Sequence, residues 1–149
     1  MKTIIASLFL ILILSACNPG PQDVTIGHDE CAHCRMIISE RPFASQLVST
    51  TGKVWFFDSV ECLAAYEIAD SVEEGRIHSR WVPDFPNPDT WVPVHDAFFL
   101  HSSQLRSPMG LHLTAYSNET TAIEHQAEFE GTILDWQQVM TLTQKHWFD

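Results

Sequence analysis

Apolar residues recur at two different spacings along this chain, and these spacings predict two successive runs of strand, strand, helix and strand. Short stretches of alternating or continuous apolar residues are typical of strands, whereas apolar residues three and four apart are typical of a helix. The first run is expected at residues 43–48 (strand), 53–57 (strand), 60–69 (helix) and 80–82 (strand). The second run is expected at residues 97–100 (strand), 110–116 (strand), 120–129 (helix) and 132–134 (strand), with a last short helix at 135–142.

Turn and capping residues mark the ends of several expected elements. Thr51-Gly52 is a turn signal between the first two strands, and Asp58-Ser59 is a helix N-cap signal. Ser117-Asn118-Glu119 provides the corresponding cap in the second run. Pro and Asp are frequent at residues 83–90, where we expect a loop. The five Trp are expected in the core.

The repeated order of elements predicts an α+β fold built from two homologous strand-strand-helix-strand units. We place the first unit at residues 27–90 and the second at residues 91–149. Units of this size are too small to be stable alone, so we expect the two to pack together around one core.

The N-terminal residues have the features of a bacterial lipoprotein signal. Residues 1–16 contain Lys2 and then an apolar run that is shorter than the roughly 20 residues a membrane span needs. Leu14-Ser15-Ala16-Cys17 resembles a lipobox, in which Cys17 becomes the lipidated first residue, although an ordinary signal peptide is the alternative. Residues 17–26 then form a tether. We expect a lipoprotein that faces the periplasm, anchored in the inner or the outer membrane.

The charge of the chain excludes one class of partner. The formal net charge is −11, and removal of residues 1–16 takes away Lys2 and no acidic residue, which gives −12. Nucleic-acid binding depends on Lys and Arg that neutralise phosphates, so no nucleic-acid partner is expected. An acidic surface suits a basic partner, or serves solubility alone.

Residues 31–36 (CAHCRM) bring two thiols, an imidazole and a thioether into one short segment. Cys and Met sulfur are soft donors that favour Cu(I). With Cys17 assigned to lipid, three Cys remain, so at least one is unpaired. A C-x-x-C pair also occurs in thiol-disulfide enzymes and as half of a zinc site, but neither of these uses the thioether of Met36. Met36 therefore favours copper.

The spacing within this motif predicts its backbone. Cys34 and Met36 point to the same side only if the segment is extended or looped, because on a helix they would lie about 200° apart. We therefore expect a non-helical segment in which Cys34, Met36 and Cys31 are the candidate metal ligands. His33, Cys62 and Met109 are further candidates, but each also has a structural explanation.

The order and spacing of several short motifs resemble those of the NosL family. These motifs are C-x-x-C-x-M (Cys31, Cys34, Met36), FA-x-QLV (43–48), GKV-x-F-x-D (52–58), ECL (61–63), A-x-F (97–99), SPMG (107–110) and Gly131. One departure is Ser59-Val60-Glu61, where an Asp-Ile-Gly type of sequence is common in the family.

The resemblance implies a copper-binding lipoprotein that assists assembly of the copper centres of periplasmic nitrous-oxide reductase. It implies two homologous units with a treble-clef-like fold, similar to an organomercurial lyase, and a Cu(I) site of Cys and Met sulfur. Cys34 and Met36 match the family more firmly than Cys31 does. The implied partner is apo nitrous-oxide reductase or its assembly machinery, and the implied role is metal delivery without catalysis.

Two other functions remain open at the level of the sequence. A thiol-disulfide oxidoreductase would use Cys31 and Cys34, although the strand-to-helix setting typical of thioredoxin-like proteins is missing. A structural zinc site would need four ligands, such as Cys31, Cys34, Cys62 and a His.

Overall fold

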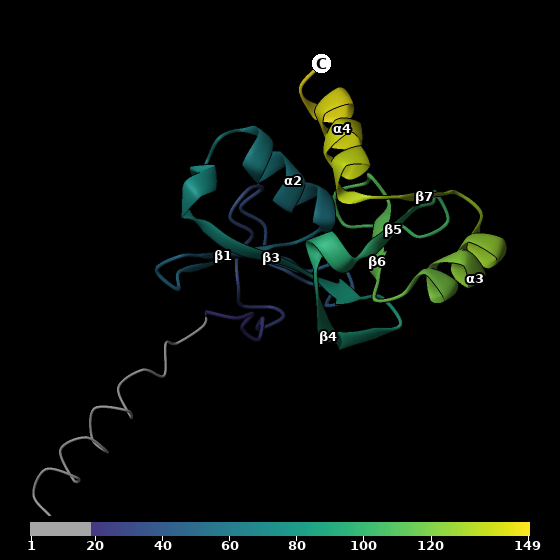
Figure 1. The fold of residues 1–149 in the computed structure, drawn as a ribbon, viewed down its shortest axis with the longest axis horizontal. Coiled ribbons are helices and arrows are strands. Elements are labelled where there is room, and N and C mark those ends of the chain that lie inside the picture. The colour runs from purple at the N-terminus through teal and green to yellow at the C-terminus, as the bar shows by residue number, and fades with distance from the viewer. Residues whose placement is uncertain (1–18) are drawn as a thin grey trace, which may run out of the picture.

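The computed structural model describes residues 19–149 as two antiparallel sheets and three α-helices (Figure 1). The proposed signal peptide at 1–16 and the lipidation residue Cys17 lie outside the described residues. Among the helices within residues 19–149, none combines the length and the apolar character needed to span a bilayer.

The first sheet has four strands in the spatial order β2-β1-β3-β4, and every neighbouring pair is antiparallel. Helix α2 and the short 3-10 helix η2 connect β2 to β3. The bounds are β1 Ser45–Ser49, β2 Val54–Phe57, α2 Val60–Ile68, η2 Glu74–Arg76, β3 Ile77–Asp84 and β4 Asn87–Pro93.

The second sheet has three strands in the order β6-β5-β7, again antiparallel, and it is followed by the C-terminal helix. Its elements are the 3-10 helix η3 Val94–Asp96, β5 Phe98–His101, β6 Leu113–Tyr116, α3 Glu119–Phe129, β7 Thr132–Leu134 and α4 Trp136–Trp147. In both sheets the first strand of the run lies in the middle, with its hairpin partner on one side and the strand after the helix on the other. The mixed α and β architecture is confirmed, whereas the homology of the two units stays a prediction.

Side-chain caps begin the helices where the sequence indicates. Ser59 accepts a hydrogen bond from the backbone N–H of Cys62 at 3.3 Å, and Asn118 accepts one from Thr121 N at 2.9 Å. Asp135 and Gln138 form a reciprocal capping box at the start of α4. This helix continues to Trp147, beyond the end expected at residue 142, because it packs against α2 and buries Thr143 there.

The expected loop at residues 83–90 is the main error in the predicted elements. Strand β3 continues to Asp84, a two-residue turn follows, and β4 begins at Asn87. Strand β4 lies at the edge of its sheet and pairs only with β3, so Pro88 and Pro93 remove no hydrogen bond from a second neighbour. Residue 90, where the sequence placed the end of the first unit, therefore lies inside a strand.

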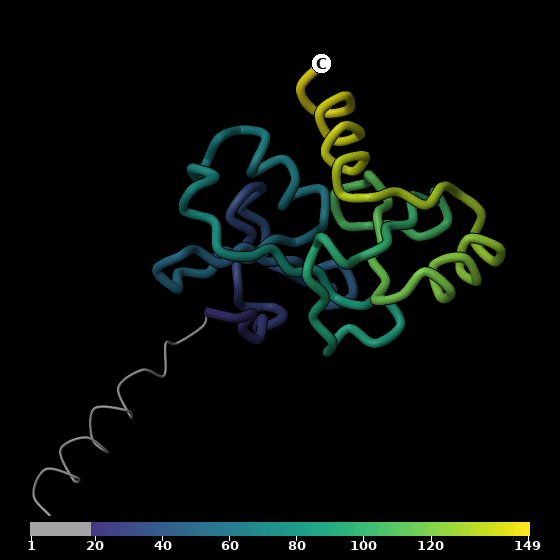
Figure 2. Tube along the Cα trace, in the orientation of Figure 1, coloured from purple at the N-terminus to yellow at the C-terminus, as the bar shows by residue number. Residues whose placement is uncertain are grey.

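One apolar core joins the two halves of the chain. It contains Leu47, Phe57, Leu63 and Val82 from the first half together with Phe99, Leu113 and Val139 from the second. Helices α2 and α4 lie side by side, and Figure 2 shows the C-terminal segment, in yellow, returning toward the teal segment that contains α2. The shared core that we expected from the size of the units is present.

The Trp residues lie at the margin of this core. Each of the five is partly buried, and the fully buried side chains are mainly Val, Leu, Phe and Ala. The prediction of a Trp core is therefore wrong. A Trp side chain carries an N–H that needs a partner, and at the margin it keeps access to solvent or to a polar side chain, as Trp81 does by donating to Ser79 Oγ at 2.8 Å.

Gly131 permits the tight passage from α3 back to β7. Its φ is +114°, and a Cβ at this position would lie 2.2 Å from the carbonyl oxygen of His101 on β5. Because that atom belongs to the backbone of the neighbouring strand, a side chain here would force the strands apart.

Candidate metal centre

Residues 27–38 form a tight loop that folds back on itself before β1. Cys31 N donates to Met36 O at 2.8 Å, Arg35 N donates to Cys31 O at 3.0 Å, and Ile38 N donates to Asp29 O at 2.9 Å. Arg35 has φ +68°, in the left-handed region that L-residues seldom occupy. The loop contains turns and no helix, which confirms the non-helical backbone predicted for this segment.

Three free thiols converge where this loop meets the first turn of α2. The Sγ atoms of Cys31, Cys34 and Cys62 all lie within 4.8 Å of one another. Cys31 and Cys62 are fully buried, whereas Cys34 is partly accessible. The group thus has two buried cysteines and one that is partly accessible.

Hydrogen bonds make the three thiols unequal. The hydrogen bond from Cys62 lowers the pKa of Cys31 to about 5, and the backbone N–H groups of Cys34, Asp58 and His33 add to this effect against the opposing effect of burial. The pKa of Cys34 is raised, chiefly by burial. The pKa of Cys62 is raised because its thiol is the hydrogen-bonding partner of the Cys31 sulfur. Cys31 is therefore the most acidic thiol of the group.

The other candidate ligands are Met36, His33 and Met109, and His33 does not join the group of three thiols. The side chain of Met36 is 52% exposed, although its backbone N–H is directed to the Cys34 sulfur. The imidazole of His33 stacks on the indole of Trp147, with ring centroids 5.9 Å apart and planes 8° apart. Met109 is partly buried against the same core cluster that includes Cys31 and Cys62, and it comes from the second half of the chain.

Two buried carboxyl groups beside the thiols were not predicted as part of the site. Asp58 is buried, burial raises its pKa, and its Oδ1 has no hydrogen-bond partner. Glu61 is fully buried, and burial raises its pKa as well. In the sequence both residues have the ordinary appearance of acids at a helix start, and this appearance carries no sign of burial.

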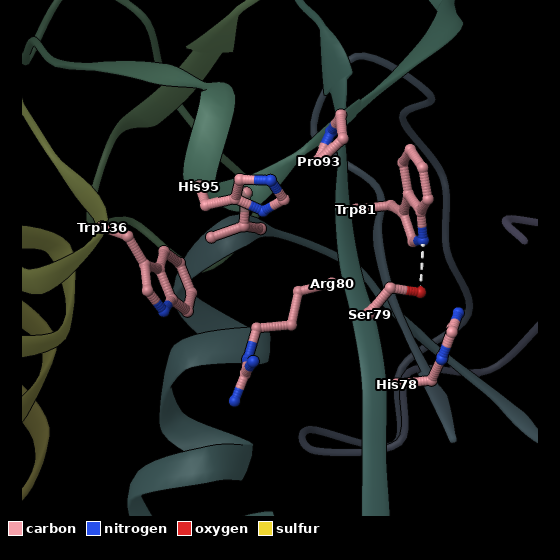
Figure 3. A pocket seen from close by; sticks show the side chains of 8 residues that line it. His78, Ser79, Arg80, Trp81, Pro93, His95 and Trp136 are labelled. Carbon is pink, nitrogen blue, oxygen red and sulfur yellow. Dashed lines mark hydrogen bonds between the residues drawn. The ribbon is translucent and has the colours of Figure 1, made fainter. Parts of the chain in front are cut away.

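A separate hollow of about 240 Å³ lies against β3 and η3 (Figure 3). It is lined in part by His78, Arg80, Trp81, His95 and Trp136. Arg80 is already paired with two carboxylates, and the indole N–H of Trp81 with Ser79. Its lining contains none of the thiols, and among the His, Cys, Asp and Glu side chains of residues 19–149 the three Cys are the group that could hold a metal ion.

Comparison with known proteins identifies the family and the fold of this chain. The crystal structure of the copper chaperone NosL from Shewanella denitrificans has the same fold, with a TM-score of 0.68 and 22% sequence identity, covering 80% of this chain and 95% of that one. No curated protein matches the chain. The family model NosL matches residues 23–143, which is most of the sequence. The resemblance drawn from the short motifs is thereby confirmed, and the chain belongs to the NosL family.

Proposed function

We propose that this protein is a copper chaperone that carries Cu(I) as its cargo on cysteine sulfur and transfers it to another protein without catalysis. The observation that supports this most directly is the group of three unpaired thiols within 4.8 Å of one another. Thiolates are soft ligands that select Cu(I) over harder cations. Its family includes a protein described as a copper chaperone.

The number of ligands favours copper over structural zinc. A structural zinc site is closed by four ligands. Within the described part of the chain, the thiol group contains three residues, and no His, Asp or Glu joins it. Three sulfurs suit Cu(I), which accepts low coordination and makes little geometric demand.

The arrangement of the thiols argues against a thiol-disulfide enzyme. A reactive cysteine combines a lowered pKa with access to its substrate. Here the thiol with the lowered pKa, Cys31, is fully buried, whereas the accessible thiol, Cys34, has a raised pKa. The two properties are on different residues.

The exposure of Cys34 supports transfer by stepwise ligand exchange. An incoming donor reaches Cys34 first, because Cys31 and Cys62 are covered. We propose that Met36 supplies a weaker, exchangeable sulfur ligand beside Cys34. We also propose that His33 and Met109 are additional ligands that can bind the copper when one of the thiols is displaced. The proposed recipient is apo nitrous-oxide reductase or its assembly machinery, where the copper would complete the enzyme's copper centres.

The purified domain without residues 1–18 is expected to bind one Cu(I) far more tightly than Cu(II), since Cu(II) prefers nitrogen and oxygen ligands. Copper K-edge absorption of the Cu(I) form should contain a sulfur shell. A spectrum with only nitrogen and oxygen neighbours would refute the proposal, and titration with Zn²⁺ under the same conditions provides the comparison with the structural-zinc alternative.

We also propose that Cys17 anchors the protein to a membrane on its periplasmic side, on the basis of the lipobox-like sequence at residues 14–17. Cys17→Ser is expected to abolish fatty-acid labelling and to release the protein from the membrane fraction. A Cys17→Ser protein that still labels with fatty acid and sediments with membranes would contradict the assignment. Cys34→Ser is the matched control, because it removes a thiol without affecting processing.

The two runs are further proposed to be homologous treble-clef-like units. The support is the matching order of elements along the chain, which is β1, β2, α2, β3 in the first run and β5, β6, α3, β7 in the second. The strands also have matching positions in their sheets, because the order β2-β1-β3 in the first sheet corresponds to β6-β5-β7 in the second.

A further inference from the structure

The Glu61 carboxyl group is buried, which is unusual for an acidic side chain. It is fully buried in the first turn of α2, immediately before Cys62. Removing a carboxyl group from water is unfavourable unless hydrogen bonds replace the lost solvation. A Leu at this position would fill space at no such cost, so the partners of Glu61 indicate what the carboxyl group does.

These partners come from the other half of the chain. Glu61 Oε1 accepts a hydrogen bond from the Ser107 hydroxyl and another from Leu111 N at 3.2 Å. Ser107 Oγ in turn accepts from His112 N at 2.8 Å, and Gly110 N donates to Ser107 O at 3.1 Å. A single carboxylate oxygen therefore holds the turn at residues 107–111 against the start of α2.

The hydrogen bonds of Glu61 join two segments that each carry a sulfur-containing side chain. On one side, the next residue after Glu61 is Cys62, whose Sγ lies within 4.8 Å of the other two thiols. On the other side, the turn carries Met109, which packs against the cluster containing Cys31 and Cys62. If the carboxyl group is removed, the first turn of α2 keeps its Ser59 cap but loses its hydrogen bonds to the turn at 107–111, and the Ser107 hydroxyl and Leu111 N lose their acceptor.

We propose, on the basis of the copper-carrying function proposed above, that Glu61 is a positioning residue of the metal site, which fixes Cys62 Sγ relative to Cys31 and Cys34 by anchoring α2 to the turn at 107–111. It does not touch the metal. Groups that orient metal ligands through hydrogen bonds typically contribute 10–100-fold to metal affinity.

The test compares two carboxylates on the same helix. Glu61→Ala is expected to weaken Cu(I) binding by about 10-fold or more, measured against a chromogenic chelator. Glu61→Gln keeps an oxygen acceptor for Ser107 and Leu111 and is expected to bind close to the parent. Glu67→Ala is the control, because Glu67 pairs with Arg80 at 2.7 Å at the other end of α2, and its loss should lower stability without changing Cu(I) affinity.

A spectroscopic measurement separates positioning from general destabilisation. Co(II) bound to thiolates has a charge-transfer absorption that depends on the geometry of the sulfurs. The Glu61→Ala protein should have a weakened or shifted band, whereas the Glu61→Gln and Glu67→Ala proteins should keep the parent band. If Glu61→Ala does not fold, Ser107→Ala removes one donor to the same oxygen and is expected to weaken Cu(I) binding in the same direction.

The outcomes are distinct. Unchanged Cu(I) affinity in Glu61→Ala, or in Ser107→Ala where Glu61→Ala is unfolded, would overturn the role of Glu61. Equal losses in Glu61→Ala and Glu67→Ala would overturn it as well. Failure of the parent protein to bind Cu(I) would instead refute the proposed function, which is measured independently in the same titration.

Discussion

Replacement of Cys62 by Ser is expected to lower the affinity for Cu(I) by about 100-fold or more, beyond the 10–100-fold typical of groups that only orient ligands. Cys62 is one of three thiols within 4.8 Å of one another, and a Ser hydroxyl is a hard, neutral donor that does not replace a thiolate toward a soft ion. Titration against a chromogenic Cu(I) chelator measures the effect. Thermal unfolding of the metal-free protein checks that the buried hydroxyl has not disrupted the fold.

The matched comparison is Met36→Leu, which removes the thioether and keeps the volume. Because the Met36 side chain is 52% exposed and the thiols can form the site without it, we expect a loss smaller than that of any Cys→Ser variant. The family resemblance ranks Cys34 and Met36 above Cys31, and the sequence indicates Cys62 only as a further candidate, whereas our expectation rests on the three thiols that lie within 4.8 Å of one another. If Cys62→Ser binds like the parent and Met36→Leu loses most of the affinity, the ranking from the resemblance is right.

Phe99→Ala is expected to lower the free energy of unfolding by about 3–5 kcal/mol. Phe99 is fully buried on the central strand of the second sheet and belongs to the core cluster that also contains Phe57 and Cys62 from the first half. Because the halves share this core, the variant should unfold in one transition, and the buried thiols of Cys31 and Cys62 should become reactive in the same transition. Chemical denaturation followed by circular dichroism and by thiol labelling measures both.

Ile123→Ala is the control for this experiment. Its side chain is 51% exposed on α3, so its removal should change stability by no more than about 0.5 kcal/mol. Two separate transitions in Phe99→Ala, with Cys31 and Cys62 protected through the first, would contradict the shared core and would favour two units that fold independently.

The sequence was most informative where the physical signal is local. The N-cap residues Ser59 and Asn118, the continuous apolar run at 54–57 and the alternating pattern at 110–116 depend on neighbours within a few residues, and the corresponding elements are present. The order of elements along the chain follows from the same signals. Strand β4 was missed because its prolines are tolerated only at the edge of a sheet, and edge position depends on the whole topology.

The candidate metal site was predictable in part for the same reason. Cys31 and Cys34 are close in sequence, so their proximity could be inferred from the motif itself. Cys62 reaches them only because α2 starts beside the loop, and a single Cys near a helix start has the same pattern whether it is a ligand or a small buried residue. The burial of Glu61 depends on the turn at 107–111, which no pattern around residue 61 encodes.

The stacking of His33 on Trp147 has a consequence for when the site is completed during biosynthesis. The loop with the first two thiols is made early, but the indole that covers its imidazole belongs to the last turn of α4 and is made near the end of translation. A nascent or truncated chain that ends before α4 therefore presents the thiols beside an uncovered imidazole. The loop therefore reaches its finished, covered geometry only after the last turn of α4 has been made.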